Sequence, residues 1–332
     1  MRTYNTADMD LRPADIWQAR ARIKPWIRRT PLVYSSALSE RTGCHVYLKL
    51  ECWQVCGCFK VRGAVNMVVS LPPEERRRGV TAASSGNHGI ALAYAASLFG
   101  DTRAIVYAPE NADPTKLRKI RALGGEVRLH GENYLLALDE ALRQVEEGDL
   151  TLVHSHAHPL VMAGQGTIGL EIMEDQPDVD AIVVPIGGGG LISGIATAVK
   201  AISESVNIIG VEPTAAPGAY MSFRDGVPHE QIELKPSIAD GLLGGFAPLS
   251  WKICRDRVSQ VVLVDDGEIA NAMRVFQQDE QLMIEAASSV GLAAMLSGKL
   301  DALKGRKVAF VITSRNVDAN KYNQIVSQHS GG

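Results

Sequence analysis

The stretch AIVVPIGGGGLISGIATAV, residues 181–199, decides how this chain is interpreted. It begins as an apolar, β-branched strand that ends at Pro185, passes through four glycines and becomes helical near Leu191. Glycines let backbone N–H groups approach an anion closely, and the start of a helix adds partial positive charge. We interpret Gly187, Gly188, Gly189 and Gly190 as a phosphate cradle, because a merely flexible turn gives no reason for four glycines at a strand-to-helix junction.

Composition excludes several classes of protein. The stretch 181–199 is long and uncharged, but Pro185 and the glycines interrupt it, so we expect no membrane span. Of 332 residues, 46% are hydrophobic, which excludes a disordered chain, and 34 Lys and Arg against 37 Asp and Glu leave no positive excess for nucleic acid. The N-terminal residues lack the apolar core of a signal peptide, and the five cysteines contain no CxxC pair. We therefore expect a reduced protein of the cytoplasm.

Runs rich in Val and Ile alternate with helical patterns. Such runs, buried on both sides, predict parallel sheets covered by helices and hence an α/β fold. In the helix expected over 134–147, Leu135, Leu138, Leu142 and Val145 share one face. The predicted strands cover residues 46–50, 79–82, 104–107, 126–129, 150–153, 181–184, 208–211, 261–264 and 308–312.

Two further segments carry chemistry. The run Ser84-Ser85-Gly86-Asn87-His88 lies between a predicted strand and a helix, where hydroxyls, an amide and free N–H groups suit a carboxylate, although an ordinary helix cap is the plainer interpretation. Lys60 lies in a glycine-flanked apolar context, GCFKVRGA. A buried lysine has a lowered pKa and can form a Schiff base, whereas most lysines lie on the surface.

The glycine loop alone also allows a dinucleotide-binding interpretation. Gly188, Gly190 and Gly194 loosely fit the dinucleotide fingerprint, and Glu212 ends the next strand, where an acid would bind ribose. This alternative, an NAD-dependent dehydrogenase, lacks the strict GxGxxG and leaves the Lys60 and Ser84–His88 segments unexplained.

Together the motifs resemble the fold-type II pyridoxal-phosphate enzymes, above all serine/threonine dehydratases (threonine ammonia-lyases) and serine racemase. The resemblance covers nearly the whole chain, with specific motifs in the same order. These motifs are RTPLVYSSALSE, LKLE, FKVRGA, SSGNHG, AGQGTIGLEI, PIGGGGLISG, GVEP, IADGL and RNVD.

The resemblance implies a role for each matching residue. Lys60 would hold pyridoxal 5′-phosphate as a Schiff base and move the Cα proton, with Phe59 beside the ring. Asn87 would hydrogen-bond the phenolic oxygen, Gly187–Gly190 would wrap the phosphate, and Thr313 would face the pyridine nitrogen. The substrate carboxylate would be bound by Ser84, Ser85, Gly86, Asn87 and His88. Ser85 matches the acid/base residue of the racemases.

The resemblance also implies architecture and partners. We expect a discontinuous large cofactor-binding domain, residues 1–66 and 155–332, and a small domain, residues 67–154, with the cofactor between two open parallel sheets. No C-terminal regulatory domain is expected, because the chain ends 14 residues after Asp318. A homodimer and a small amino-acid substrate are expected, with neither nucleic acid nor membrane as partner.

Some residues depart from the family pattern. Cys56 and Cys58 stand where relatives have hydroxyl residues, Arg315 replaces a glycine near the ring, and Glu285-Ala286-Ala287-Ser288 replaces Glu-Pro-Ala-Gly. The acid that completes a divalent-metal site after Glu212 is missing, so we expect no metal. His154, His156 and His158 would face one side of a strand and could form a metal site, although a polar loop is the plainer interpretation.

The expected activity is a pyridoxal-phosphate-dependent carbon–oxygen lyase that converts L-threonine or L-serine to a 2-oxo acid and ammonia by α,β-elimination. A racemase and a 3-hydroxyaspartate dehydratase are the alternatives within the family. A cofactor-binding relative without turnover is a third, and the dehydrogenase is the remote one.

Overall fold

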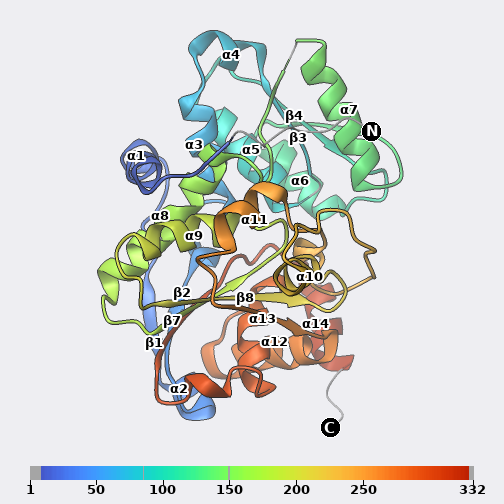
Figure 1. Cartoon of the computed structure of the whole chain (residues 1–332). Helices are drawn as coiled ribbons and strands as arrows, with labels where there is room; N and C mark the ends of the chain where they lie inside the picture. Colours follow the sequence, from blue (N-terminus) through green and yellow to red (C-terminus); the bar gives the residue numbers. More distant parts are fainter. Residues whose placement is uncertain (1–8, 85, 149, 329–332) are drawn as a thin grey trace.

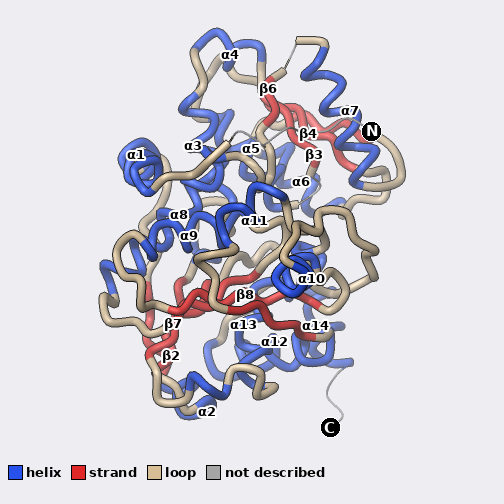
Figure 2. Tube along the Cα trace, in the orientation of Figure 1, coloured by secondary structure: helices blue, strands red, loops and turns tan. Residues whose placement is uncertain are grey.

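The computed structural model describes residues 9–84, 86–148 and 150–328. Within these residues the strands form two sheets, which Figures 1 and 2 show in separate parts of the molecule. The six-stranded sheet has the order β1-β2-β10-β7-β8-β9, and the four-stranded sheet the order β5-β4-β3-β6. The strands are β1 (Leu32–Ser35), β2 (His45–Lys49), β3 (Val80–Ala83), β4 (Ala104–Ala108), β5 (Glu126–Leu129), β6 (Thr151–Leu152), β7 (Ala181–Pro185), β8 (Asn207–Pro213), β9 (Gln260–Val264) and β10 (Lys307–Val311).

Helices surround both sheets. They are α1 (Pro13–Ile23), α2 (Ser36–Thr42), α3 (Lys60–Ser70), α4 (Pro73–Arg78), α5 (Asn87–Ser97), α6 (Pro114–Ala122), α7 (Tyr134–Glu146), α8 (Pro159–Asp175), α9 (Gly190–Lys200), α10 (Gly218–Asp225), α11 (Pro248–Cys254), α12 (Asp266–Glu280), α13 (Ala286–Leu296) and α14 (Ala319–Gln328). Three short 3₁₀ turns are η1 (Glu51–Trp53), η2 (Asp240–Leu242) and η3 (Asp301–Leu303).

The six-stranded sheet is buried on both faces. On β7, Ala181 and Val183 pack with residues of α12 and α13, while Ile182 and Val184 pack with residues of α9. Alternate residues of a strand point to opposite faces, so a continuous apolar strand has a helical layer on each side. All its pairings are parallel except that of β1 with β2, which is antiparallel.

The four-stranded sheet is wholly parallel and lies between α5 on one face and α7 on the other. The α7 helix contacts it through Ala137 and Ala141, together with Leu138. The apolar face predicted for this helix is therefore partly wrong, because Leu135 is 51% exposed. Two alanines one turn apart bring the helix close to the sheet, and this turns Leu135 outward.

Helices α3 and α8 pack closely between the two sheets. A Cβ on Gly63 would lie 2.7 Å from the carbonyl oxygen of Val161, and a Cβ on Gly164 2.5 Å from that of Arg62. Only glycine allows this approach of two helix backbones, which fixes α3 and its first residue, Lys60, against α8.

The α/β fold with parallel sheets is confirmed, and each of the nine predicted strands has a counterpart in the structure. The antiparallel edge strand β1, LVYS, was not predicted, because its four residues alternate too briefly to be recognised. No described helix is long and apolar enough to cross a lipid bilayer.

Candidate active site between the two sheets

Lys60 is the first residue of α3, and its Nζ donates a hydrogen bond of 2.8 Å to the carbonyl oxygen of Ser155. Nζ also lies 5.2 Å from the centre of the Phe59 ring. Burial lowers the pKa of Lys60 to about 8, against an ordinary value of 10.5. The lowered pKa is the direction that the sequence predicts, and about a tenth of such an amine is neutral at pH 7. A neutral amine is a nucleophile.

The loop that presents Lys60 is held by the segment that follows β10. The N–H of Phe59 donates to the carbonyl oxygen of Thr313, and the N–H of Arg315 to that of Gly57, both at 3.0 Å. Gly57 has a φ of +69°, in the left-handed region that favours glycine. The side chain of Arg315 is exposed and lies over Gly57. Arg315, which replaces a glycine of the family pattern, therefore does not crowd the buried part of the site.

The glycine loop has the donors of an anion site. In the described part of the chain, the N–H groups of Gly187–Gly190 donate to no protein acceptor. A Cβ on Gly188 would lie 2.3 Å from the imidazole of His156, and a Cβ on Gly189 2.4 Å from the ring of Phe246. The loop is thus enclosed by side chains that only glycines accommodate, while its donors remain at the start of α9. This arrangement fits a phosphate group.

Ser84 and Gly86 lie between β3 and α5, and Asn87 and His88 are the first two residues of α5. The Oγ of Ser84 accepts the N–H of Gly86 at 3.2 Å, so the hydroxyl shapes the turn. Ser85, the predicted second catalytic residue, lies outside the described residues. His88 is buried, its Nε2 donates to the carbonyl oxygen of Val153 at 2.7 Å, and burial lowers its pKa to about 3. The imidazole is therefore neutral, and the charge available to a carboxylate here is that of the helix start.

The side chain of Asn87 is oriented by Glu285, which precedes α13, and by Asn316, which follows β10 of the six-stranded sheet. Its Nδ2 donates to both oxygens of Glu285, at 3.0 and 3.1 Å, and its Oδ1 accepts Nδ2 of Asn316 at 2.7 Å. Asn316 is fixed in turn, because its Nδ2 also donates to the carbonyl oxygen of Cys56 and its Oδ1 accepts Nζ of Lys119. Because the two oxygens of one carboxylate lie side by side, they share a single Nδ2 hydrogen, and the other hydrogen of the Asn87 amide remains for a ligand. In the sequence, Glu285 stands out only as part of a departure from the family pattern and Asn316 only within the motif RNVD, so neither role was predicted.

Thr313 is buried, and its Oγ1 lies 2.8 Å from the Oγ of Ser288. Ser288 also accepts the N–H of Ser314. The hydroxyl of Thr313 is thus a neutral group in a fixed position.

The histidine run is not a metal site among the described residues. The strand expected there ends at Leu152, and residues 154–158 form a loop. Nδ1 of His154 accepts the N–H groups of His156 and Ala157, and Nδ1 of His158 accepts the N–H of Leu160 as the N-cap of α8. The three rings therefore do not face one side, because the backbone turns instead of alternating.

Glu212 caps a helix. Its two carboxylate oxygens accept the N–H groups of Ala219 and Tyr220, each at 2.9 Å, at the start of α10, and burial raises its pKa to about 8. Both oxygens are thus engaged within the protein. This observation removes the ribose-binding acid that the dehydrogenase alternative needs.

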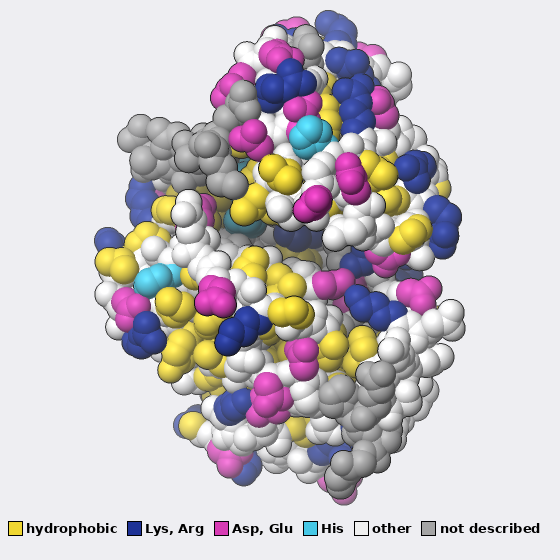
Figure 3. All heavy atoms as spheres, turned by 90° about the vertical axis from the view of Figure 1, so that its right-hand side faces the viewer, with side chains coloured by type: hydrophobic (Ala, Val, Ile, Leu, Met, Phe, Trp, Pro, Cys, Tyr) yellow, Lys and Arg dark blue, Asp and Glu magenta, His cyan; other side chains and the backbone are white. Residues whose placement is uncertain are grey.

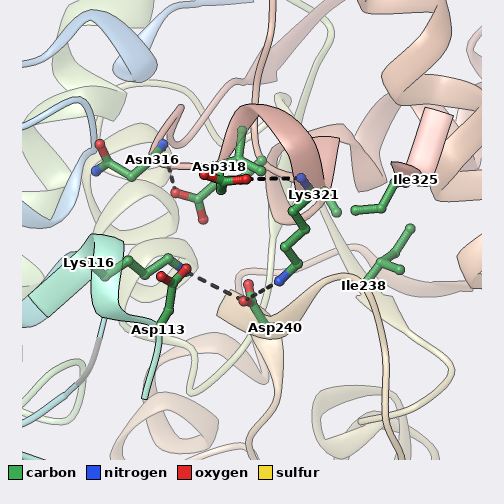
Figure 4. Close-up of a pocket in the computed structure, with 11 residues that line it drawn as sticks. Asp113, Lys116, Ile238, Asp240, Asn316, Asp318, Lys321 and Ile325 are labelled. Carbon is green, nitrogen blue, oxygen red and sulfur yellow. Dashed lines mark hydrogen bonds and ion pairs between the residues drawn. The ribbon is translucent and has the colours of Figure 1, made fainter. Parts of the chain in front are cut away.

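A polar recess lies between α6 and the segments η2 and 316–325 (Figure 4). Asp240 accepts Nζ of Lys116 at 3.5 Å and Nζ of Lys321 at 3.1 Å. Figure 3, turned so that the right side of Figure 1 faces the viewer, shows a hollow in the middle of the molecule on this side. The carboxylate therefore links a helix beside the four-stranded sheet to the C-terminal helix.

Comparison with known proteins identifies the family. The family model described as "Pyridoxal-phosphate dependent enzyme" matches residues 23–314. The chain belongs to this family. This pyridoxal-phosphate-dependent enzyme is 44% identical over 315 residues to an L-threonine ammonia-lyase of Thermotoga maritima, covering 95% of this chain and 78% of the relative. It is 36% identical over 310 residues to a serine racemase of Oryza sativa subsp. indica, covering 91% and 90%.

A solved structure agrees with these sequence relatives. The fold of the pyridoxal-phosphate-dependent enzyme matches maize serine racemase with a TM-score of 0.89 and 35% identity, over 96% of this chain and 98% of that one. The cofactor is pyridoxal phosphate, and the fold is that of the fold-type II enzymes. The residues described above fit this cofactor. The buried amine of Lys60, with its lowered pKa, lies in the same site as the glycine loop, whose N–H groups have no acceptor among the described residues and can bind a phosphate.

Proposed function

We propose that the enzyme converts L-threonine, and L-serine as a second substrate, to a 2-oxo acid and ammonia. The observation that carries this proposal is the 44% identity to an L-threonine ammonia-lyase along 95% of the chain, joined to a site with the parts that elimination requires. When bound, pyridoxal phosphate supplies a sink for the electron pair left by the broken Cα–H bond.

Lys60 is proposed to take the Cα proton of the substrate at Nζ. Its burial supports this role, because an amine whose pKa is about 8 accepts a proton and returns it at a working pH near neutrality. The charge of the Lys60 amine in turn contributes to the lowered pKa values of His88 and His154, so both imidazoles are neutral beside it. Lys60 would also hold the cofactor covalently before substrate arrives.

The start of α5 is proposed to bind the substrate carboxylate. Asn87, the first residue of the helix, places its N–H group at the first turn, where an anion is favoured, and Gly86 shapes the turn through its bond to Ser84. Ser84, Ser85 and His88 complete the predicted segment. Asn87 would keep one Nδ2 hydrogen for the phenolic oxygen, because Glu285 takes the other.

Thr313 is proposed to face the pyridine nitrogen. A neutral hydroxyl, unlike a carboxylate, does not hold a proton on that nitrogen, so the electron sink is weaker. A weaker sink suits elimination, because the electron pair moves on at once as hydroxide leaves Cβ. The overall change is balanced, since the water lost by elimination is regained when the released imine is hydrolysed.

The test is formation of 2-oxo acid from L-threonine and L-serine by the purified enzyme with pyridoxal phosphate, followed as its hydrazone. The expected result is turnover of both, with the higher kcat/KM for L-threonine, and none in Lys60→Ala. A parent enzyme that binds the cofactor but forms no 2-oxo acid from either substrate would contradict the proposal.

Racemisation is the second candidate, because a serine racemase relative covers 91% of the chain at 36% identity. Chiral chromatography of L-serine incubated with the enzyme measures D-serine in the same reaction. D-serine formed faster than pyruvate would make racemisation the main activity.

We also propose the two-domain division at residues 67–154, a homodimer and a cytoplasmic location. The four-stranded sheet lies within residues 80–152 and has its own apolar cluster, which supports the division. The free cysteines Cys44, Cys52, Cys56, Cys58 and Cys254 suit a reducing compartment. Light scattering of the purified protein tests the dimer, for which the expected mass is twice 35.7 kDa.

A further inference from the structure

His156 closes one side of the glycine loop. The ring atoms Cδ2, Nε2 and Cε1 all lie within 2.5 Å of the position that a Cβ on Gly188 would take, so the edge of the ring that bears Nε2 faces this glycine. The carbonyl oxygen of His156 lies 2.6 Å from the corresponding point on Gly190. His156 is therefore packed against the same backbone whose N–H groups have no protein acceptor.

The loop that carries His156 is held on both sides. Its N–H donates to Nδ1 of His154, and the two rings meet edge to face with centroids 4.6 Å apart. The preceding residue, Ser155, accepts Nζ of Lys60 at its carbonyl oxygen. A single turn of backbone thus connects the Schiff-base lysine to the phosphate loop, and the position of His156 is fixed.

The hydroxyl of Ser155 determines which nitrogen of His156 carries the proton. Nδ1 of His156 lies 2.9 Å from the Oγ of Ser155. Burial and the neighbouring His154 hold the pKa of His156 well below its ordinary value of 6.5, so the ring is neutral and has one N–H. When Ser155 donates its hydroxyl hydrogen to Nδ1, the proton of the ring is on Nε2.

We propose that His156 donates its Nε2–H to the cofactor phosphate held by Gly187–Gly190, as a side-chain donor added to the backbone cradle. A dianion next to Nε2 favours this tautomer over the other, which would present a lone pair to the phosphate. The Ser155 hydroxyl acts as a positioning group, because it carries no charge and only fixes the proton on Nε2.

Cofactor affinity, rather than turnover, tests this assignment. The apo-protein is titrated with pyridoxal 5′-phosphate and, separately, with pyridoxal, the same aldehyde without phosphate, and both dissociation constants are taken from absorbance. In His156→Phe the dissociation constant for pyridoxal phosphate is expected to rise on the order of ten- to a hundredfold, the usual value of a hydrogen bond to a charged group. That for pyridoxal is expected to stay within about twofold.

The variants include a rescue and a control. His156→Gln keeps a donor near the position of Nε2, so it is expected to retain most of the affinity for pyridoxal phosphate. His158→Asn makes a comparable change in the same loop but keeps a good N-cap for α8, and both ligands are expected to bind as in the parent.

The comparison of two ligands in one variant separates binding from folding. Weaker binding of pyridoxal phosphate alone supports the proposal, whereas equal weakening of both ligands, or no weakening, overturns it. If His156→Phe does not fold, Ser155→Ala takes its place, because it removes only the hydroxyl that fixes the proton. Ser155→Ala is then expected to raise the dissociation constant of pyridoxal phosphate about threefold and to leave that of pyridoxal unchanged. Equal effects on both dissociation constants overturn the proposal.

Discussion

Replacing Arg62 by methionine tests what holds α3, and thus Lys60, in place. The guanidinium is fully buried and donates to both oxygens of Glu51, at 2.7 and 2.8 Å, and to both oxygens of Glu171, at 2.8 and 2.9 Å. Lys49, also fully buried, supplies the second positive charge through Glu171 at 2.6 Å. Two cations and two carboxylates thus balance in the interior, between α3, α8 and β2.

In Arg62→Met one of the two cations is lost. Glu171 keeps Lys49, but Glu51 keeps only the hydroxyl of Thr30. An unpaired buried charge of this kind costs about 3–5 kcal/mol, a large part of the roughly 5–15 kcal/mol by which a folded domain is stable. Urea unfolding of the holoenzyme is followed by far-UV circular dichroism. The free energy of unfolding is expected to fall by this amount, which appears as a lower urea midpoint with the slope m unchanged.

The double variant Arg62→Met/Glu51→Gln shows whether the cost comes from the charge. Glu51→Gln alone is expected to destabilise the parent, because it takes an acceptor from Arg62, but to restore about 2 kcal/mol in the methionine background. The reasoning would be refuted if Arg62→Met lowered the free energy of unfolding by less than about 1 kcal/mol. It would also be refuted if Glu51→Gln changed that free energy equally in the parent and in Arg62→Met.

Three further outcomes are expected. Burial lowers the pKa values of His88 and His154 to about 3 and that of His158 to about 4, so the unfolded chain binds protons that the folded chain does not. Stability is then complete above pH 6.5 and is lost as the pH falls, by at most about 4 kcal/mol per pH unit for the three groups, and urea midpoints at pH 7, 6 and 5 measure it. Asn316→Leu leaves Oδ1 of Asn87 without its donor, and the absorption band of bound cofactor is expected to shift; Asn66→Leu, a buried change that does not touch Asn87, is expected to lower stability alone. In competitive labelling of the apo-protein with acetic anhydride, Lys60 is expected to reach half-maximal reactivity near pH 8, and a value near 10.5 would contradict its burial.

The sequence predicts the alternating strands and helices of this fold well, because apolar strands such as 181–184 and the glycines that follow them can be recognised from neighbouring residues alone. It also indicates Lys60 and Ser84–His88, whose residue types are unusual for their local context. The hydrogen bonds that orient Asn87 could not be predicted, because their partners Glu285 and Asn316 lie about 200 residues away in the sequence and no residue near Asn87 indicates them. The plainer interpretation of the histidine run, a polar loop, is confirmed, whereas the alternative of a strand fails because β6 ends at Leu152 and the backbone then turns.

The hydrogen bonds from the Lys60 loop to the segment after β10 have a consequence for synthesis on the ribosome. Residues 57 and 59 form hydrogen bonds with residues 315 and 313, so the loop cannot form these bonds until almost the whole chain has been synthesised. At about 5–20 residues per second, that interval is on the order of 13–50 seconds. During this time the nascent chain has its lysine but no finished site, and a product truncated before β10 would not acquire one.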